Sequence, residues 1–294
     1  MGLPPSPDGR GTMSDLAIRV VRTGVDGVAL PLVEGPGRMD ALVWTGMGAV
    51  HRAMHRVVLE PGGRTVRLHH RTSEAVYFVV RGNGLAVEDG RTITHPLRAG
   101  MMFHVPPDTP YRIQTAAGPL VCVGGPCPPD QEMYAGIPPR RRPEVQGRDT
   151  RPEPARAGAE PSRGNGRGKG IRVFDVGRDG VAMPLISRDA RMIVWPGVGA
   201  RTASMNYVIL EADEANKPHQ HPVSEDTIYV LEGEGAVENQ TLGKTHPIKG
   251  ECVLHVPPTV VHAVRAHTRM VSVGGPCPPD LDFLRACGVR WDEP

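Results

Sequence analysis

Short apolar runs recur along the whole chain, and each is bounded by glycine, proline or charged residues. The runs are five or six residues long and rich in β-branched side chains, which is typical of strands in a barrel or a sandwich. The pattern therefore predicts an all-β protein. The runs occupy residues 54–59, 75–80 and 101–105 in the first half, and 205–210, 227–231 and 252–256 in the second.

The two halves of the chain repeat each other. The sequence His-Val-Pro-Pro begins at His104 and again at His255, an offset of 151 residues. The sequence Val-Gly-Gly-Pro-Cys-Pro-Pro-Asp begins at Val123 and again at Val273, an offset of 150 residues. Such self-similarity indicates an internal duplication, so we expect two barrels of the same kind.

A polar segment separates the repeats. Residues 139–170 hold eight Arg, six Gly and five Pro and have almost nothing to bury, so we expect a flexible basic linker there. The expected domains are then an N-terminal barrel over residues 13–138 and a C-terminal barrel over residues 171–294. Residues 1–12, which are rich in Pro and Gly, are expected to be disordered.

Composition narrows the choice of partners. The 294 residues include 34 basic and 32 acidic side chains, so the formal net charge of +2 favours neither nucleic acid nor an anionic membrane. No apolar window approaches the roughly 18 residues of a membrane span, and the N-terminus has no signal core, so we expect a cytoplasmic protein. The five cysteines lack metal-binding spacing and predict free thiols. A small-molecule substrate is the expected partner.

Candidate chemistry concentrates around two histidines in the second half. His219 and His221 are two residues apart, so in an extended segment both imidazoles face one point. Asp226 follows in a β-rich run and can return its carboxylate to that point from the neighbouring strand. Two histidines and a carboxylate outline a metal site. Glu225 is adjacent, and a one-residue bulge would bring it in instead, so it remains the alternative carboxylate ligand.

A second motif follows, in which a strand and a Pro-Pro turn lead to His262. Together, His-x-His-x4-acid-x6-Gly and Gly-x-strand-Pro-Pro-x3-His resemble the two sequence motifs of the cupin superfamily. The resemblance implies tandem antiparallel barrels of the double-stranded β-helix type, a bicupin, and bicupins often form homodimers. It also implies that His219, His221, the acid and His262 converge on one divalent metal. The chain departs from the usual pattern by having Asp226 in place of Glu and Thr259 in place of Gly.

The first copy provides an internal comparison, because its Gly82 matches Gly233 of the second copy. Only one of the four ligand positions keeps its residue type, so we expect the N-terminal barrel to lack an intact metal site. A shifted site that uses His69 and Glu74 is conceivable, although three or four donors are normally needed. The residues that correspond to His219, His221, Asp226 and His262 are Leu68, His70, Ala75 and Tyr111.

The ligand set suits one Fe(II), Mn(II), Ni(II) or Zn(II) ion per chain. The favoured interpretation is a dioxygenase-like Fe(II) oxidoreductase for a small organic acid, enol or phenol. One alternative is a Lewis-acid isomerase, decarboxylase or hydrolase that uses Mn, Zn or Ni, and another is a binding protein without turnover. Glu225 is the candidate catalytic acid or base. The expected substrate pocket is formed by Asn206, Ile228, Val230 and Val264.

Overall fold

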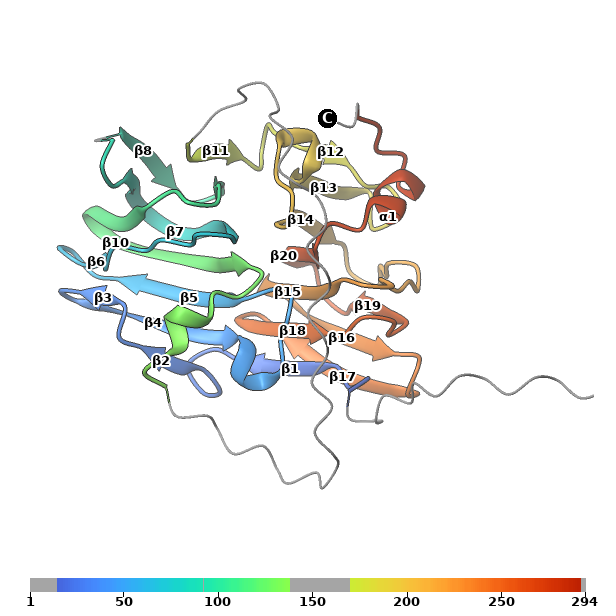
Figure 1. Ribbon diagram of the computed structural model, residues 1–294. Helices are drawn as coiled ribbons and strands as arrows, with labels where there is room; N and C mark the ends of the chain where they lie inside the picture. Colours follow the sequence, from blue (N-terminus) through green and yellow to red (C-terminus); the bar gives the residue numbers. More distant parts are fainter. Residues whose placement is uncertain (1–14, 92, 138–169, 292–294) are drawn as a thin grey trace, which may run out of the picture.

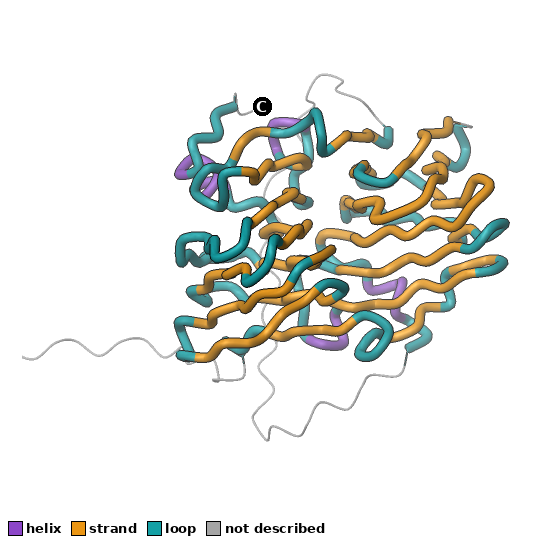
Figure 2. Tube along the Cα trace, turned by 180° about the vertical axis from the view of Figure 1, so that it is seen from behind, coloured by secondary structure: helices purple, strands orange, loops and turns teal. Residues whose placement is uncertain are grey.

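The computed structural model describes residues 15–91, 93–137 and 170–291. The expected disordered start, residues 1–12, and the expected linker, residues 139–170, therefore lie outside the described residues, apart from Gly170. Two antiparallel β-barrels lie side by side, one formed mainly by each half of the chain (Figure 1). Strands make up most of both barrels, and the helical turns are short (Figure 2). The all-β prediction with two tandem cupin-type barrels is confirmed.

The N-terminal barrel is built on one large sheet. Its strands and 3₁₀ turns are β2 (Val28–Leu30), β3 (Val33–Glu34), β4 (Gly37–Val43), η1 (Thr45–Met47), β5 (Met54–Leu59), β6 (Arg64–Thr65), β7 (Glu74–Glu88), β8 (Ile93–Arg98), β9 (Met101–Val105), β10 (Tyr111–Cys127) and η2 (Gln131–Tyr134). The long strands β7 and β10 pair along their length and slip in register midway. Gly82 permits the bend in β7, because its φ is 84° and a Cβ would lie 1.8 Å from the Pro119 carbonyl oxygen.

The C-terminal barrel repeats this plan with its long strands divided. Its elements are β12 (Val181–Ala182), β13 (Asp189–Val194), η3 (Pro196–Val198), β14 (Met205–Leu210), β15 (Glu225–Glu232), β16 (Glu234–Asn239), β17 (Lys244–Lys249), β18 (Cys252–Val256), β19 (His262–Ala266), β20 (Met270–Cys277) and α1 (Leu281–Ala286). Gly233, with a φ of 88°, separates β15 from β16 and corresponds to Gly82. One sheet contains β18, β15, β20 and β14, and a smaller sheet contains β17, β16 and β19.

Each half of the chain contributes its first strand to the opposite barrel. Strand β1 (Arg19–Arg22) pairs with β18, so that Arg19 faces His255. Strand β11 (Arg172–Asp175) pairs with β9, so that Arg172 faces His104. The two exchanges are equivalent in position. The barrels are therefore joined by backbone hydrogen bonds as well as by side-chain packing.

Two buried glutamates tie the barrels together. Glu74, the first residue of β7, accepts hydrogen bonds from the backbone N–H groups of residues 201–203 at 2.8–2.9 Å. Glu225, the first residue of β15, accepts them from the backbone N–H groups of residues 50–52 at 2.8–3.2 Å. We call these contacts the Glu74 clamp and the Glu225 clamp. Each carboxylate thus belongs to one barrel and its donors to the other.

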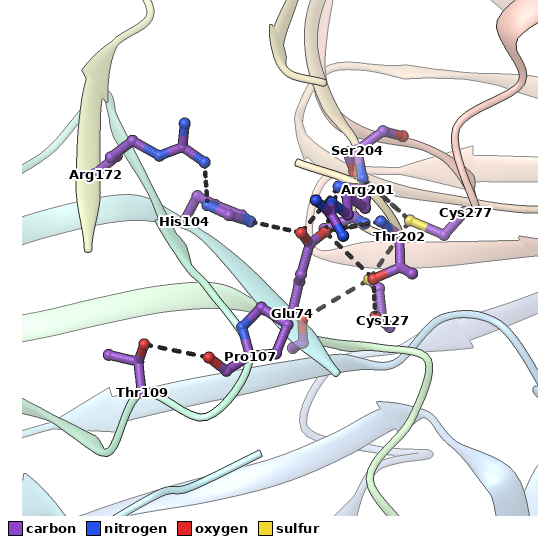
Figure 3. Close-up of polar contacts among 12 residues, drawn as sticks. Glu74, His104, Pro107, Thr109, Cys127, Arg172, Arg201, Thr202, Ser204 and Cys277 are labelled. Atoms are coloured by element: carbon purple, nitrogen blue, oxygen red, sulfur yellow. Dashed lines mark hydrogen bonds and ion pairs between the residues drawn. The ribbon is translucent and has the colours of Figure 1, made fainter. Parts of the chain in front are cut away.

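A histidine lies next to the carboxylate of each clamp. The Nε2 of His104 lies 3.6 Å from the Glu74 carboxylate, and Arg172 donates to the Nδ1 of His104 at 3.1 Å (Figure 3). Because Nδ1 accepts, a neutral His104 ring carries its proton on Nε2, facing the carboxylate. In the other barrel, His255 lies at the same distance, 3.6 Å, from Glu225. The repeated histidines are therefore part of the contact between barrels.

An apolar core fills the space between the two barrels, separate from the core inside each. Burial of a Val or Met side chain stabilises the fold by about 1.5–3 kcal/mol, so this shared core favours a single unit. Its fully buried members from both halves include Val43, Met54, Val76, Val123, Val194, Met205, Val253 and Val273. Among the described residues, no helix is long and apolar enough to cross a membrane.

Candidate metal centre

Three histidines and an aspartate meet inside the C-terminal barrel. One candidate ligand atom from each of His219, His221, Asp226 and His262 lies within 4.8 Å of all the others. His219 and His262 face each other across an isolated β-bridge, whose backbone hydrogen bonds measure 3.0 and 2.9 Å. The carbonyl of His221 accepts a hydrogen bond from Thr259 at 2.8 Å. The Pro-Pro turn therefore holds the two histidine segments beside each other.

Each histidine of the cluster directs its Nδ1 at a fixed acceptor. The acceptors are the Lys217 carbonyl for His219 (2.9 Å), the Asp280 carboxylate for His221 (2.9 Å) and the Val260 carbonyl for His262 (3.0 Å). An acceptor at Nδ1 assigns the ring proton to that atom, so in the neutral rings Nε2 offers a lone pair. Among the described residues, the Nε2 atoms of His221 and His262 and the Oδ1 of Asp226 are buried without a hydrogen-bond partner. A metal ion would satisfy these orphaned atoms.

The charge states of the cluster also suit a cation. Burial lowers the pKa of His219 to about 4, and the neighbouring His262 and His221 add to this effect. His219 is therefore a neutral imidazole at neutral pH. Burial alone would raise the pKa of Asp226, but the surrounding histidines outweigh it and lower that pKa to about 2. Neutral imidazoles and an ionised carboxylate are the donors that divalent transition metals prefer.

Asp280 connects the cluster to the C-terminal helix. Its carboxylate accepts from the Nδ1 of His221 and also caps α1 by accepting from the backbone N–H of Phe283 at 3.0 Å. The Phe283 ring stacks on His219 with centroids 4.9 Å apart and meets the His221 ring edge-on at 5.1 Å. The helix therefore fixes the orientation of two of the rings and adds an aromatic wall beside them.

A cavity of about 470 Å³, measured with its open mouth, lies next to the cluster. Its wall is mostly apolar, with three amide or hydroxyl side chains and three of the four cluster residues. The apolar residues are Ile186, Val208, Leu210, Ile228, Val264, Pro276 and Phe283, the polar ones are Asn206, Asn216 and Ser272, and the cluster residues are His219, His221 and Asp226. Three predicted pocket residues, Asn206, Ile228 and Val264, thus line the cavity. Val230 does not, because it is fully buried in the packed core of the barrel.

Two carboxylates considered as ligands point elsewhere. Successive residues of a strand face opposite sides, so Asp226 faces the barrel interior and Glu225 faces the other barrel, where its clamp occupies both oxygens. The structure therefore does not bring Glu225 to the cluster or to the cavity, either as a ligand or as a catalytic group. Nor does it gather His69 and Glu74. His69 lies against Asp108, with Nε2 to Oδ1 at 2.8 Å, and Glu74 forms the other clamp.

The corresponding region of the N-terminal barrel is filled by a different set of side chains. Leu68 and Tyr111 form the isolated β-bridge that matches the bridge between the second barrel's histidines. The Nδ1 of His70 still bonds a carboxylate, Asp130, at 2.7 Å. Its Nε2 lies 3.1 Å from the Tyr111 hydroxyl, so the nitrogen that would face a metal faces a phenol. That this barrel binds no metal remains a prediction.

One buried charge cluster was missed by the sequence analysis. Arg52 reaches from the first half into the second barrel, where its Nη1 donates to the carbonyls of Ser204 and Gly275 and to the Cys277 sulfur. The Sγ atoms of Cys277 and Cys127 lie 3.4 Å apart. Burial would raise the pKa of Cys277, but the hydrogen bond with Cys127 and the charge of Arg52 outweigh it and lower that pKa. Arg52 therefore favours the thiolate form of Cys277.

Comparison with known sequences gives one family. The cupin domain matches residues 55–123 and again residues 206–273, one match in each barrel. An uncharacterised protein of Methanocaldococcus jannaschii is 28% identical over 65 residues, which are 22% of this chain and 50% of that protein. The chain thus spans half the length of this curated relative.

Comparison with solved structures gives similar folds over nearly the whole chain. The protein Ylba from E. coli aligns over 92% of this chain and 94% of its own, with a TM-score of 0.61 and 16% identity. The oxalate decarboxylase of Lactobacillus farciminis, in a formate complex, aligns over 92% and 88%, with a TM-score of 0.63 and 17% identity. The oxalate decarboxylase of Bacillus subtilis aligns over 92% and 78%, with a TM-score of 0.63 and 14% identity. At this level of identity the likeness concerns the fold.

Proposed function

Because the chain belongs to the cupin superfamily and has one cupin barrel in each half, we propose that its C-terminal barrel is a mononuclear metal enzyme for a small organic molecule. His219, His221, Asp226 and His262 would hold one divalent ion. The observation that carries this proposal is the set of buried acceptor atoms on His221, His262 and Asp226, which converge where no donor from the described part of the chain satisfies them. Asp280 would keep His221 in the ligating tautomer.

For the reaction, we propose Fe(II)-dependent oxygenation. Bound Fe(II) would supply the one-electron chemistry that lets an organic substrate react with O2. His219, His221, Asp226 and His262 would hold the ion beside the cavity, and a six-coordinate ion with four protein ligands would have room for O2 and the substrate. The residues that line the cavity include no Asp, Glu, His, Lys, Tyr or Cys beyond the cluster itself. Oxygenation of an already ionised substrate needs no protein acid or base, whereas isomerisation needs a group that moves a proton.

The second candidate is non-redox catalysis by Mn, Zn or Ni acting as a Lewis acid. It is favoured by the likeness to two oxalate decarboxylases across 92% of the chain. In either reaction the chain's own residues would have the same tasks. The imidazoles and the carboxylate hold the ion, Phe283 and the aliphatic side chains exclude water, and Asn206 offers an amide to the substrate.

Metal content and oxygen consumption test this proposal. We expect about one divalent ion per chain in protein purified without added metal. Protein reconstituted with Fe(II) should consume oxygen with a substrate from a panel of enols, phenols and 2-oxo acids, and the Zn(II) form should bind without turnover. Anaerobic turnover with Zn, Mn or Ni would replace the oxygenase with the Lewis-acid enzyme. Protein that binds metal but turns over nothing would favour a binding protein. A homodimer and a cytoplasmic location also remain predictions.

A further inference from the structure

The wall of the cavity carries no cation of its own. None of its thirteen residues is Lys or Arg, and seven are apolar. Arg52 is the buried cation whose charge bears on Asp226, but it is not a lining residue. Its Nη1 donates to the carbonyls of Ser204 and Gly275 and to the Cys277 sulfur, none of which lines the cavity. This cation is therefore held by groups outside the wall.

The charges of the four protein ligands and of the ion determine which charge on a bound small molecule is favourable. Three neutral imidazoles and one carboxylate around a divalent ion leave a net charge of +1. A ligand with one negative charge would make the buried site neutral. A second negative charge would remain uncompensated among aliphatic side chains, and burial of an unpaired charge is strongly unfavourable.

The shape and polarity of the wall indicate which chemical groups suit the part of the ligand that does not face the cluster. Ile228 on β15 and Val208 on β14 line the wall from the two strands that flank β20, and the Phe283 ring closes it beside His219. The side chain of Asn206 has no hydrogen-bond partner among the described residues, so its amide is available to one neutral polar group. An apolar body of a few carbons would therefore contact the wall while an oxygen pair faces the cluster.

We propose that this cavity selects a compact oxygen chelate with one negative charge and an apolar body, and discriminates against ligands with a second carboxylate. The class includes enolates, phenolates and 2-oxo monocarboxylates. The inference rests on the proposed metal centre and narrows its substrate class. It separates this chain from enzymes for oxalate, although oxalate decarboxylases share its fold.

The test compares two probes with the same chelating head. 2-Oxovalerate and 2-oxoglutarate have equal chain length and differ only in the tail, which is a methyl group in one and a carboxylate in the other. Binding to the Zn(II)-loaded full-length protein is measured by titration calorimetry at neutral pH, and zinc content is checked before and after. We expect 2-oxovalerate to bind at least about tenfold more tightly. Asn206→Lys, which adds a cation to the wall, should reduce this ratio, whereas the matched uncharged variant Asn206→Gln should keep it.

The outcomes separate the two levels of the proposal. If the protein retains zinc and binds both probes equally, or binds neither, the selectivity inference is wrong and the metal centre stands. If the protein does not bind zinc, the proposed metal centre fails and the inference fails with it. A preference for 2-oxoglutarate in the wild-type protein would also overturn the inference.

Discussion

The Glu225 clamp predicts that Glu225→Gln weakens the fold and leaves the metal site intact. The Oε2 atom of Glu225 accepts from three backbone N–H groups at 2.8–3.2 Å, and its Oε1 accepts from the first of them at 2.9 Å. Glutamine keeps one acceptor oxygen, removes the charge and places an NH2 group against a donor. A hydrogen bond to a buried charged group contributes about 1.5–3 kcal/mol and a neutral one about half as much. Across three bonds, the expected loss of unfolding free energy is about 3 kcal/mol.

The matched variant in the other barrel is Glu74→Gln. The Glu74 clamp has three backbone donors at the equivalent positions of the second half, so we expect a similar loss. Both variants are measured by urea denaturation on chelator-treated protein, because bound metal would add its own stabilisation. Asp226→Asn should behave in the opposite way, with lost metal and a smaller change in stability. If Glu225→Gln instead loses its metal and keeps its stability, Glu225 is a ligand and the clamp reasoning is refuted.

The pH dependence of stability provides a second measure of the same contact. Burial alone would raise the pKa of Glu74, but His104 and the backbone donors outweigh it and lower that pKa from 4.5 to about 2. A depressed folded-state pKa means that the stabilisation is complete above about pH 4.5 and is lost as the pH falls towards 2. The shift corresponds to about 3 kcal/mol, in agreement with the hydrogen-bond estimate. Glu74→Gln should therefore flatten the stability profile in this acid range, and an unchanged profile would contradict the assignment.

Three further predictions follow from the other contacts. His219→Ala should empty the metal site by elemental analysis, whereas His70→Ala should keep about one ion per chain; equal losses would contradict a single site in the second barrel. A fragment of residues 170–294 lacks β1 and exposes the edge of β18, so it should aggregate or form dimers in gel filtration, and a monomeric, fully active fragment would rule out the coupling of the barrels. Arg52→Met should move the ultraviolet thiolate titration of Cys277 to higher pH, and an unmoved titration would mean that Arg52 does not stabilise the thiolate.

The sequence predicted the features that depend on local spacing. Histidines at i and i+2 of an extended segment face the same side, and an acid five residues later can face that side from the next strand. His219, His221 and Asp226 are close together in this way. The two barrels could be predicted because the repeat at an offset of 150–151 residues is visible without any structure. The choice between Asp226 and Glu225 follows from strand alternation, because only one of two adjacent carboxylates faces inward, and Asp226 is the one near the histidines.

Contacts between the halves were not predictable in the same way. The exchange of β1 and β11 joins residues more than 60 positions apart and leaves no local pattern. The Glu225 clamp did have a signal, because Glu74 occupies the same position in the first copy, where three of the four candidate ligand positions hold other residues. A residue kept in both copies, when most candidate metal ligands are present in only one, is explained by a task that both barrels share. The pairing of Arg52 with Cys277 had no such signal, because Ala203 occupies the equivalent position in the second half.

The exchanged strands and reciprocal clamps have a consequence for the history of the chain. Each barrel adds the equivalent strand to the other barrel's sheet, and each places the equivalent glutamate against the other barrel's backbone. This arrangement has the symmetry of a two-fold dimer of identical subunits. Fusion of two such subunits would preserve the interface and make association independent of protein concentration. After such a fusion the two copies occupy different stretches of one chain, so a substitution in one copy does not alter the other. One copy can then lose its metal ligands and remain a required subunit, because the other copy cannot complete its sheet without it.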